Sequence, residues 1–300
     1  MKGRKKNIAV TGANGYLGSF ISDFLKKKYN IYKLTRFPKK NNKKEYLFNL
    51  KDNFSNNFFR QNNIDTLIHC AHDFKETSYK KSYEVNVHSS EQLFKKATDA
   101  GVKKIIFISS MVAHDKNTSV YSRIKKDIEK ITLKFKGIVV KPSLIVGNKP
   151  GGIVKTIDKL IKKFYVIPVI SFNKQFLYTV NDFELCQKIY KFIISFNKYK
   201  NKKFIITNKY PINLEEIFLF FKRKNKTKNI FIPINWRILW LLIKFIELFF
   251  YLPIRSDSIK TLASTIKLST NNRLLKEKDL YFYVSNNYKD CKVLLTSLRL

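Results

Sequence analysis

Short apolar segments that alternate with amphipathic segments predict an α/β fold, in which helices cover both faces of a mainly parallel sheet. The apolar segments lack the polar alternation of a half-exposed strand, as in Lys104–Ser110 (KIIFISS). The segments between them space apolar residues three and four apart, as in Tyr16–Lys28. With 300 residues, 44% of them hydrophobic, the chain can bury a sizeable core, which excludes wholesale disorder.

The first half of the chain is expected to alternate strands with helices. Gly101 is expected to end the helix that begins at Tyr83, because glycine is common directly after a helix C-terminus. The predicted strands are Asn7–Thr11, Ile31–Thr35, Tyr46–Leu50, Asp65–Ala71, Lys104–Ser110 and Ile138–Lys141, and the predicted helices are Tyr16–Lys28, Tyr83–Ala100 and Val120–Lys134. This alternation is typical of a doubly wound sheet.

The second half is less regular and predicts a smaller, mostly C-terminal α/β domain. Its predicted helices are Ile153–Phe164, Asp182–Phe196 and Asn213–Phe221, and its predicted strands are Phe176–Thr179 and Phe204–Ile206. We expect the sheet domain to comprise residues 1–146 and about 172–207. The smaller domain then comprises about 147–171 and 208–300 and binds the substrate.

Trp236–Leu252 (WRILWLLIKFIELFFYL) is almost wholly apolar. Its three charges fall within about 80° of helix circumference, and it is shorter than the roughly 20 residues that span a bilayer. A transmembrane helix is therefore disfavoured. A buried helix of the smaller domain is the leading interpretation, and a helix in the membrane interface or an oligomer contact are the alternatives.

The formal net charge of +37 raises nucleic acid or an anionic membrane as a partner. Only nine of the 59 basic residues are arginine, and Lys, Asn, Ile, Phe and Tyr, which share A/T-rich codons, are all abundant. Base composition therefore explains the lysines more simply than selection for a polyanion, and a nucleic-acid partner is disfavoured. The three cysteines, Cys70, Cys186 and Cys291, are far apart, so reduced thiols are expected rather than disulfides or zinc. The apolar stretch after the basic N-terminus is too short for a signal peptide.

Thr11–Gly18 (TGANGYLG) follows a predicted strand and opens a helix, which is the context that a dinucleotide-binding fingerprint requires. Gly12 permits the tight turn, Gly15 lets the backbone approach a pyrophosphate, and Gly18 lets helix and strand pack closely. The start of the helix then offers free N–H groups to the phosphates. This predicts a Rossmann-like domain with Gly12, Asn14, Gly15, Tyr16, Leu17 and Gly18 at the cofactor.

The Gly-x-x-Gly-x-x-Gly spacing resembles the extended short-chain dehydrogenases/reductases, specifically the NAD-dependent epimerase/dehydratase family. The resemblance implies a Tyr-x-x-x-Lys pair on a helix of the sheet domain. Four such pairs occur, and only Tyr121/Lys125 lies on the helix after a strand that ends in paired serines. Residues four apart share a helix face, so Lys125 is expected to lower the pKa of Tyr121, making it a proton donor or acceptor at a carbinol oxygen.

Further positions match the family motifs. The resemblance implies that Ser110, rather than Ser109, orients the reacting oxygen, and that Ala71 and His72 border the cofactor ribose. Asn86 would support the active site, and Pro142, in Lys141–Gly147 (KPSLIVG), would border the nicotinamide. Asn49 and Leu50 would lie by the adenine, and Lys125 would also hold the nicotinamide ribose.

The cofactor preference is read from the end of the second strand. No acidic residue is present there for a ribose 2′-hydroxyl, whereas Arg36 can meet a 2′-phosphate, so NADP is preferred and NAD is the alternative. Met111-Val112 replace the acidic pair of the dehydratases, which disfavours dehydration. Leu144 replaces an asparagine that many sugar epimerases use, and the four histidines lack metal-ligand spacing, so no metal is expected.

The resemblance implies an NAD(P)-dependent epimerase or ketoreductase of a nucleotide-linked sugar, with a lipid-linked sugar as a variant that suits Trp236–Leu252. The alternative is a non-catalytic NAD(P)-binding scaffold or sensor at a membrane or on RNA. A homodimer through the helices Tyr83–Ala100 and Val120–Lys134 is an expectation by analogy. The expected location is cytoplasmic, with a peripheral contact at the inner face of the membrane as the variant.

Overall fold

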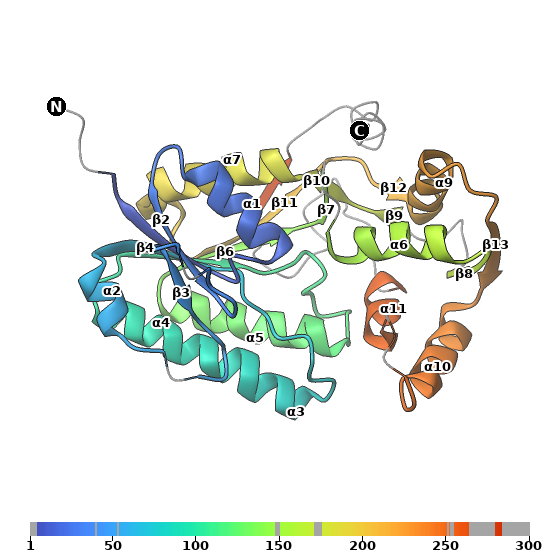
Figure 1. Cartoon of the computed structure of the whole chain (residues 1–300), viewed down its shortest axis with the longest axis horizontal. Coiled ribbons are helices and arrows are strands. Elements are labelled where there is room, and N and C mark those ends of the chain that lie inside the picture. The colour runs from blue at the N-terminus through green and yellow to red at the C-terminus, as the bar shows by residue number, and fades with distance from the viewer. Residues whose placement is uncertain are drawn as a thin grey trace.

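One parallel sheet of eight strands organises the larger part of the chain (Figure 1). This computed structural model describes residues 5–39, 41–52, 54–147, 151–170, 176–250, 252, 255–263 and 280–283. In spatial order, the strands are β14 (Leu280–Tyr283), β11 (Lys202–Thr207), β6 (Ile138–Pro142), β5 (Lys104–Ile108), β4 (Ile64–His69), β1 (Asn7–Thr11), β2 (Asn30–Thr35) and β3 (Glu45–Leu47). Every neighbouring pair is parallel, which confirms the doubly wound α/β fold.

The strand order reverses at β1, which pairs with β2 on one side and with β4 on the other. In open parallel sheets, ligands bind at such a switch point, outside the carboxyl ends of the strands. The two faces of the sheet are covered by helices. These are α1 (Tyr16–Leu25), α7 (Asp182–Ile194) and α8 (Phe196–Tyr199) on one face, and α2 (Asn57–Gln61), α3 (Tyr79–Ser82), the π-helical η1 (Tyr83–His88), α4 (Ser89–Asp99) and α5 (Val120–Lys134) on the other.

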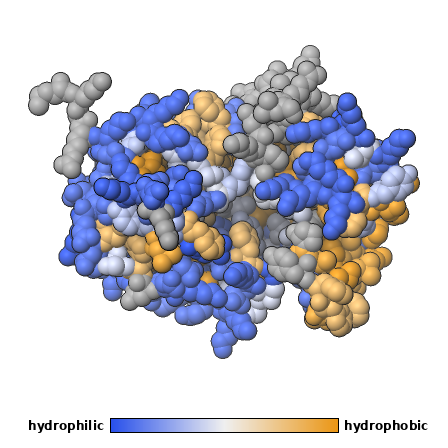
Figure 2. Space-filling view, in the orientation of Figure 1, coloured by the Kyte–Doolittle hydropathy of each residue, from blue (hydrophilic) through white to orange (hydrophobic). Residues whose placement is uncertain are grey.

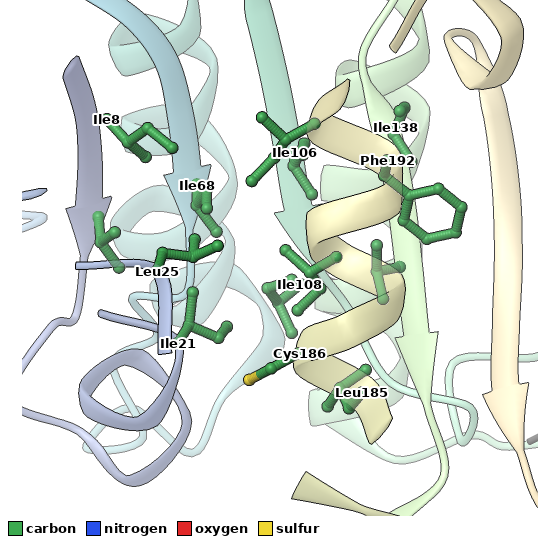
Figure 3. Close-up of a cluster of buried hydrophobic side chains, with 14 of the residues drawn as sticks. Ile8, Ile21, Leu25, Ile68, Ile106, Ile108, Ile138, Leu185, Cys186 and Phe192 are labelled. Atoms are coloured by element: carbon green, nitrogen blue, oxygen red, sulfur yellow. The ribbon is translucent and has the colours of Figure 1, made fainter. Parts of the chain in front are cut away.

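The core lies on both faces of the strands, which explains their continuous apolar sequences. In β5, Ile106 and Ile108 belong to the cluster under α1 and α7, whereas Ile105 and Phe107 belong to the cluster under α4 and α5. Figure 3 shows the first cluster, in which Phe192 of α7 packs over the strands. Because each residue of the strand has a buried neighbour, no polar alternation appears.

Most of the remaining described elements pack around a third apolar cluster beside the carboxyl edge of the sheet. They are β7 (Leu144–Val146), α6 (Gly152–Lys163), β8 (Val166–Ile170), β9 (Phe176–Leu177), β10 (Thr179–Asn181), β12 (Ile212–Asn213), α9 (Leu214–Lys224), β13 (Ile230–Ile234), α10 (Trp236–Ile246) and α11 (Ser256–Ala263). The pairs β7–β10 and β8–β13 are parallel and β9–β12 is antiparallel.

Three predicted elements differ from the structure. The predicted helix Tyr83–Ala100 is interrupted, since the π-helical η1 precedes α4. The predicted strand Phe176–Thr179 is two short strands with different partners, because Tyr178 accepts the backbone N–H of Leu144 between them. The segment Trp236–Leu252 forms a helix only to Ile246.

The leading interpretation of Trp236–Leu252 as a buried helix is wrong. Of the residues of α10, only Leu239 is buried, whereas Leu241 and Phe245 are 59% and 64% exposed. The reason is that none of the described elements covers the outer face of this helix. Among the described residues, no helix combines the length and the apolar character needed to cross a membrane.

Candidate active site

The glycine-rich turn between β1 and α1 has the close packing that its sequence predicts. Gly12 has a φ of +64°, and a Cβ there would lie 2.9 Å from the backbone nitrogen of Ala71. A Cβ on Gly18 would lie 2.3 Å from the carbonyl oxygen of Gly12, so a side chain would separate helix from strand. No side chain caps the amino end of α1. Its N–H groups are therefore available to a pyrophosphate, and the loop fits the expected dinucleotide.

A cavity of about 1040 Å³ lies between the carboxyl edge of the sheet and the C-terminal elements. It brings together all the residues that the sequence analysis predicts for the catalytic and cofactor sites. These are Gly12, Asn14, Gly15, Tyr16, Leu17, Gly18, Arg36, Asn49, Leu50, Ala71, His72, Ser110, Tyr121, Lys125 and Pro142. Helices α10 and α11 complete its wall with Trp240, Lys244, Glu247 and Asp257.

Ser110, Tyr121 and Lys125 meet at the ends of β5 and α5. The hydroxyl groups of Tyr121 and Ser110 share a hydrogen bond. Lys125 donates through Nζ to the carbonyl oxygen of Ile108 at 3.0 Å and lies 5.8 Å from the centre of the Tyr121 ring. Ser109 instead points into the core and donates to Glu129 at 2.5 Å. This division of the two serines favours Ser110 as the hydroxyl that faces a substrate.

Burial is the main cause of the pKa shifts of Tyr121 and Lys125. It raises the pKa of Tyr121 to about 12, against the opposing effect of the hydrogen bond with Ser110. It lowers the pKa of Lys125 to about 8. The expectation that Lys125 lowers the pKa of Tyr121 is therefore wrong for this arrangement. The phenolate loses more by leaving water than it gains from an ammonium group that points at a backbone carbonyl.

Aromatic rings surround the Tyr121 side chain. His72 meets its ring edge-on at 5.1 Å between ring centres, and Phe74 stacks on it at 5.8 Å with an angle of 20°. Burial lowers the pKa of His72 well below its ordinary value, so the imidazole is neutral at pH 7. The sequence analysis missed Phe74, whose exposed position after β4 has no distinguishing pattern.

The loop that carries His72 and Phe74 is pinned by Asn86. The Asn86 side chain accepts from the backbone N–H of Asp73 at 2.7 Å and donates to its carbonyl oxygen at 3.1 Å. This supports the positioning role that the sequence analysis expects. His69 also has a structural place, since its ring nitrogens bond Thr11 at 2.8 Å and Ser90 at 3.0 Å. Among the described residues, no cluster of side chains could hold a metal ion.

Buried ion pairs connect α5, the helix that carries Tyr121 and Lys125, to β6 and β11 of the sheet. Glu129 of α5 is fully buried and pairs with Lys141 at 3.4 Å and Lys203 at 3.2 Å. Lys141 is 1% exposed and also donates to the carbonyl oxygen of Ala113 at 2.8 Å. Glu129 lies four residues after Lys125, on the same helix face. The sequence analysis missed this network, although that spacing was a usable signal.

The C-terminal part of the chain reaches the catalytic helix directly. The Asp257 carboxylate of α11 accepts the backbone N–H groups of Val120 at 2.9 Å and Tyr121 at 3.1 Å. Arg255 donates to the carbonyl oxygen of Phe74. Asp257 thus acts with Ser119 to satisfy the amino end of α5. The contact joins residues 136 positions apart, and no local pattern announces it.

The loop after β2 forms the far end of the cavity. Asn14 donates to the carbonyl oxygen of Phe37 at 3.1 Å, which ties the glycine-rich turn to this loop. The side chain of Arg36 is exposed. Arg36, Asn49 and Leu50 all line the cavity. A guanidinium group here suits a 2′-phosphate.

The switch-point cavity, the glycine-rich turn and the Ser110/Tyr121/Lys125 set together define a dinucleotide-binding domain of the extended short-chain dehydrogenase type. A family model described as "NAD dependent epimerase/dehydratase family" matches residues 8–165. The chain belongs to the NAD-dependent epimerase/dehydratase family.

Individual relatives agree with this assignment. UDP-glucose 4-epimerase of Vibrio cholerae is 27% identical over an alignment of 210 residues that covers 59% of this chain and 64% of that protein, so the match spans under two thirds of the relative. The solved UDP-glucose 4-epimerase of Thermotoga maritima with UDP-glucose is similar in fold, with a TM-score of 0.64, 18% identity, and coverage of 76% of this chain and 85% of that one. The dTDP-4-dehydrorhamnose reductase of Bacillus anthracis with NADP has a TM-score of 0.65 and 19% identity, over 79% and 86% of the two chains.

Proposed function

We propose that this protein is an NAD(P)-dependent epimerase or ketoreductase of a sugar linked to a nucleoside diphosphate. The observation that carries the proposal is the hydrogen-bonded pair of Ser110 and Tyr121 beside Lys125, inside a cavity that also contains the glycine-rich turn. A pure binding scaffold has no need of a half-buried phenol, a hydroxyl and an ammonium group at one point. The sugar-nucleotide class is supported by the family and by the relatives named above.

Four groups of residues would take part in the reaction. The glycine-rich turn and the amino end of α1 would hold the pyrophosphate, and a bound nicotinamide dinucleotide supplies hydride transfer. Tyr121 would take the proton from a sugar hydroxyl on oxidation, or donate it on reduction. Ser110, already bonded to Tyr121, would hold the reacting oxygen against the phenol. Lys125, with its lowered pKa, stands next to the phenol and would bind the nicotinamide ribose.

Two finer assignments belong to the same proposal. Arg36, at the end of β2, favours NADP over NAD through its charge. The third apolar cluster would form the core of the substrate domain and close over the nucleotide. The expected bounds of that domain, about 147–171 and 208–300, include β14, which instead pairs with β11 in the sheet. Helices α4 and α5, which pack side by side on one face of the sheet, would form a homodimer interface.

The proposal is tested by turnover on a panel of UDP- and dTDP-linked sugars and their 4-keto forms, followed through reduced nicotinamide and product analysis. Tyr121→Phe should lower kcat by about 10²–10⁴-fold, because it removes the proton donor. Its affinity for the cofactor should stay within about twofold, since the ring remains in place. Turnover that is unchanged in Tyr121→Phe would contradict the assignment and favour a non-catalytic role.

A further inference from the structure

Helix α10 and the turn after it present a continuous apolar surface to solvent. We define this apolar patch as Ile238, Leu241, Leu242, Phe245, Ile246, Leu248, Phe249 and Phe250, all of which are exposed. Leu248, Phe249 and Phe250 are 73%, 66% and 68% exposed. Figure 2 shows the patch as an orange area over α10, at the lower right of the molecule. Patches of this kind on soluble proteins mark interaction surfaces.

The patch has a regular helical geometry. Ile238, Leu241, Leu242 and Phe245 are spaced i, i+3, i+4 and i+7, so they share a stripe about 100° wide. The opposite side of α10 packs inward, where Leu239 is buried in the third cluster. Trp236, Trp240 and Ile243 also pack against this cluster, and Lys244 and Glu247 line the cavity, whereas the apolar stripe points outward. Helix α10 is therefore apolar on its outer side as well as its inner side, unlike an ordinary surface helix.

We propose that the apolar patch seats the protein on an anionic phospholipid bilayer, with α10 lying in the plane of the interface. A helix of eleven residues is about 16 Å long, so it can lie in the interface but cannot span it. Cations lie beside Trp236 and Trp240, the two tryptophans of α10. Lys244 and Lys260 lie 4.8 and 4.6 Å from the Trp240 ring, and Arg237 lies 5.6 Å from the Trp236 ring. Tryptophans flanked by basic residues favour the headgroup region.

Charge distinguishes a bilayer from a second copy of the chain. A two-fold contact through the patch would bring the exposed basic residues of α10, Arg237 and Lys244, of both copies near one another, which is repulsive. An anionic lipid surface instead attracts them, along with the net charge of +37. The attraction acts whatever the evolutionary origin of the lysines. The homodimer face proposed above lies on α4 and α5 and leaves the patch open.

The same helix connects the bilayer to the cavity. Trp240 and Lys244 of α10 and Glu247, the residue after it, line the cavity wall. Glu247 accepts from the backbone and hydroxyl of Ser256, the first residue of α11, at 2.9 and 2.6 Å. The next residue, Asp257, bonds the backbone of Tyr121. Resting on the proposed function, this places the cavity beside the headgroups, within reach of a sugar diphosphate that is carried on a membrane lipid.

Vesicle flotation tests the docking. Purified full-length protein is mixed with vesicles of phosphatidylcholine alone or of equimolar phosphatidylcholine and phosphatidylglycerol. We expect flotation with the mixed vesicles, and partitioning weakened by about a hundredfold in Leu241→Ser/Phe245→Ser, at about tenfold for each apolar side chain. The matched control, Leu47→Ser/Ile194→Ser, removes two exposed apolar side chains from the sheet domain and should float like the wild type.

Three results would overturn the docking. The wild type remains unbound on both vesicle types, or the patch variant floats as well as the wild type. Alternatively, sedimentation shows a dimer that Leu241→Ser/Phe245→Ser dissociates, with no flotation, so that a second copy covers the patch. Calorimetric titration of NADP into each variant verifies the fold independently. Flotation of a wild type that binds neither NAD nor NADP would contradict the proposed function and leave the docking intact.

Discussion

Helix α5 buries charged residues, whereas helix α10 exposes apolar ones. Helix α5 is rich in charge, yet it buries Lys125 and Glu129 completely enough to build an active site. Helix α10 is almost wholly apolar, yet it buries Leu239 alone. The difference shows that burial of a helix depends on which other elements pack against it, and not on the amino-acid composition of the helix itself. In both helices the residues that break the usual rule are the ones to which we assign a function.

The largest stability effect is expected from the charge network beneath α5. Glu129→Ala leaves Lys141 buried without its carboxylate and should cost about 3–5 kcal/mol of unfolding free energy, as measured by urea denaturation. Replacing the pair together, in Glu129→Leu/Lys141→Met, should recover most of that loss. If Glu129→Ala costs under about 1 kcal/mol, the carboxylate is not paired as described.

A matched pair of truncations tests the contrast between the two helices directly. Ile128 of α5 is 1% exposed, so Ile128→Ala should cost about 2–5 kcal/mol. Leu242 of α10 is 52% exposed, so Leu242→Ala should change stability by under about 0.5 kcal/mol. Equal losses would mean that α10 is covered in solution and would remove the basis of the membrane docking.

The link between α11 and α5 should have an intermediate effect. Asp257→Ala removes the acceptor for the N–H groups of Val120 and Tyr121 and should destabilise the amino end of α5 by about 1–2 kcal/mol. Amide hydrogen exchange at these two positions should accelerate, and kcat/KM should fall about tenfold because Tyr121 is less well held. Asp257→Asn keeps one acceptor oxygen, so it should lose less protection from exchange and less kcat/KM than Asp257→Ala. Unchanged exchange in Asp257→Ala would rule out this contact.

A pH dependence of stability should also arise from Lys125. Its pKa falls from an ordinary 10.5 to about 8 in the folded chain, so the unfolded chain binds more protons between these values. Stability contributed by this group therefore rises as the pH increases from about 8 to 10.5 and is constant below 8. The unfolding free energy of the wild type minus that of Lys125→Met should rise in that window. A flat difference would show that Lys125 is not desolvated.

Much of the nucleotide-binding half follows from local sequence. The bounds of β1 and α5 are predicted to the residue, because an unbroken apolar run and a 3.6-residue period are local signals. The glycine-rich turn is likewise predictable, since the positive φ of Gly12 and the close packing at Gly18 exclude other side chains. Ser110 is preferred to Ser109 through the family resemblance, because it is the last hydroxyl before the short apolar run Met111-Val112-Ala113.

The rest depends on contacts that no local pattern encodes. Strands β8 and β13 are short and partly exposed, and they have no clear period. Asp257 reaches α5 across the fold, and Phe74 stacks on Tyr121 only because Asn86 pins its loop. The direction of the Tyr121 pKa shift depends on burial of the whole site, which the spacing of Tyr121 and Lys125 does not reveal. The exposure of α10 follows from the absence of any described element on its outer face, which the sequence of the helix itself does not encode.

The most direct test of the account is calorimetric titration of NAD⁺, NADP⁺ and their reduced forms into protein from which any co-purified nucleotide has been removed. The account predicts one dinucleotide per chain, with NADPH bound about tenfold more tightly than NADH because Arg36 meets the 2′-phosphate. Arg36→Ala should abolish that difference and leave NADH binding unchanged. If none of the four dinucleotides binds, the cavity at the glycine-rich turn is not a cofactor site, and the enzymatic function proposed here is wrong.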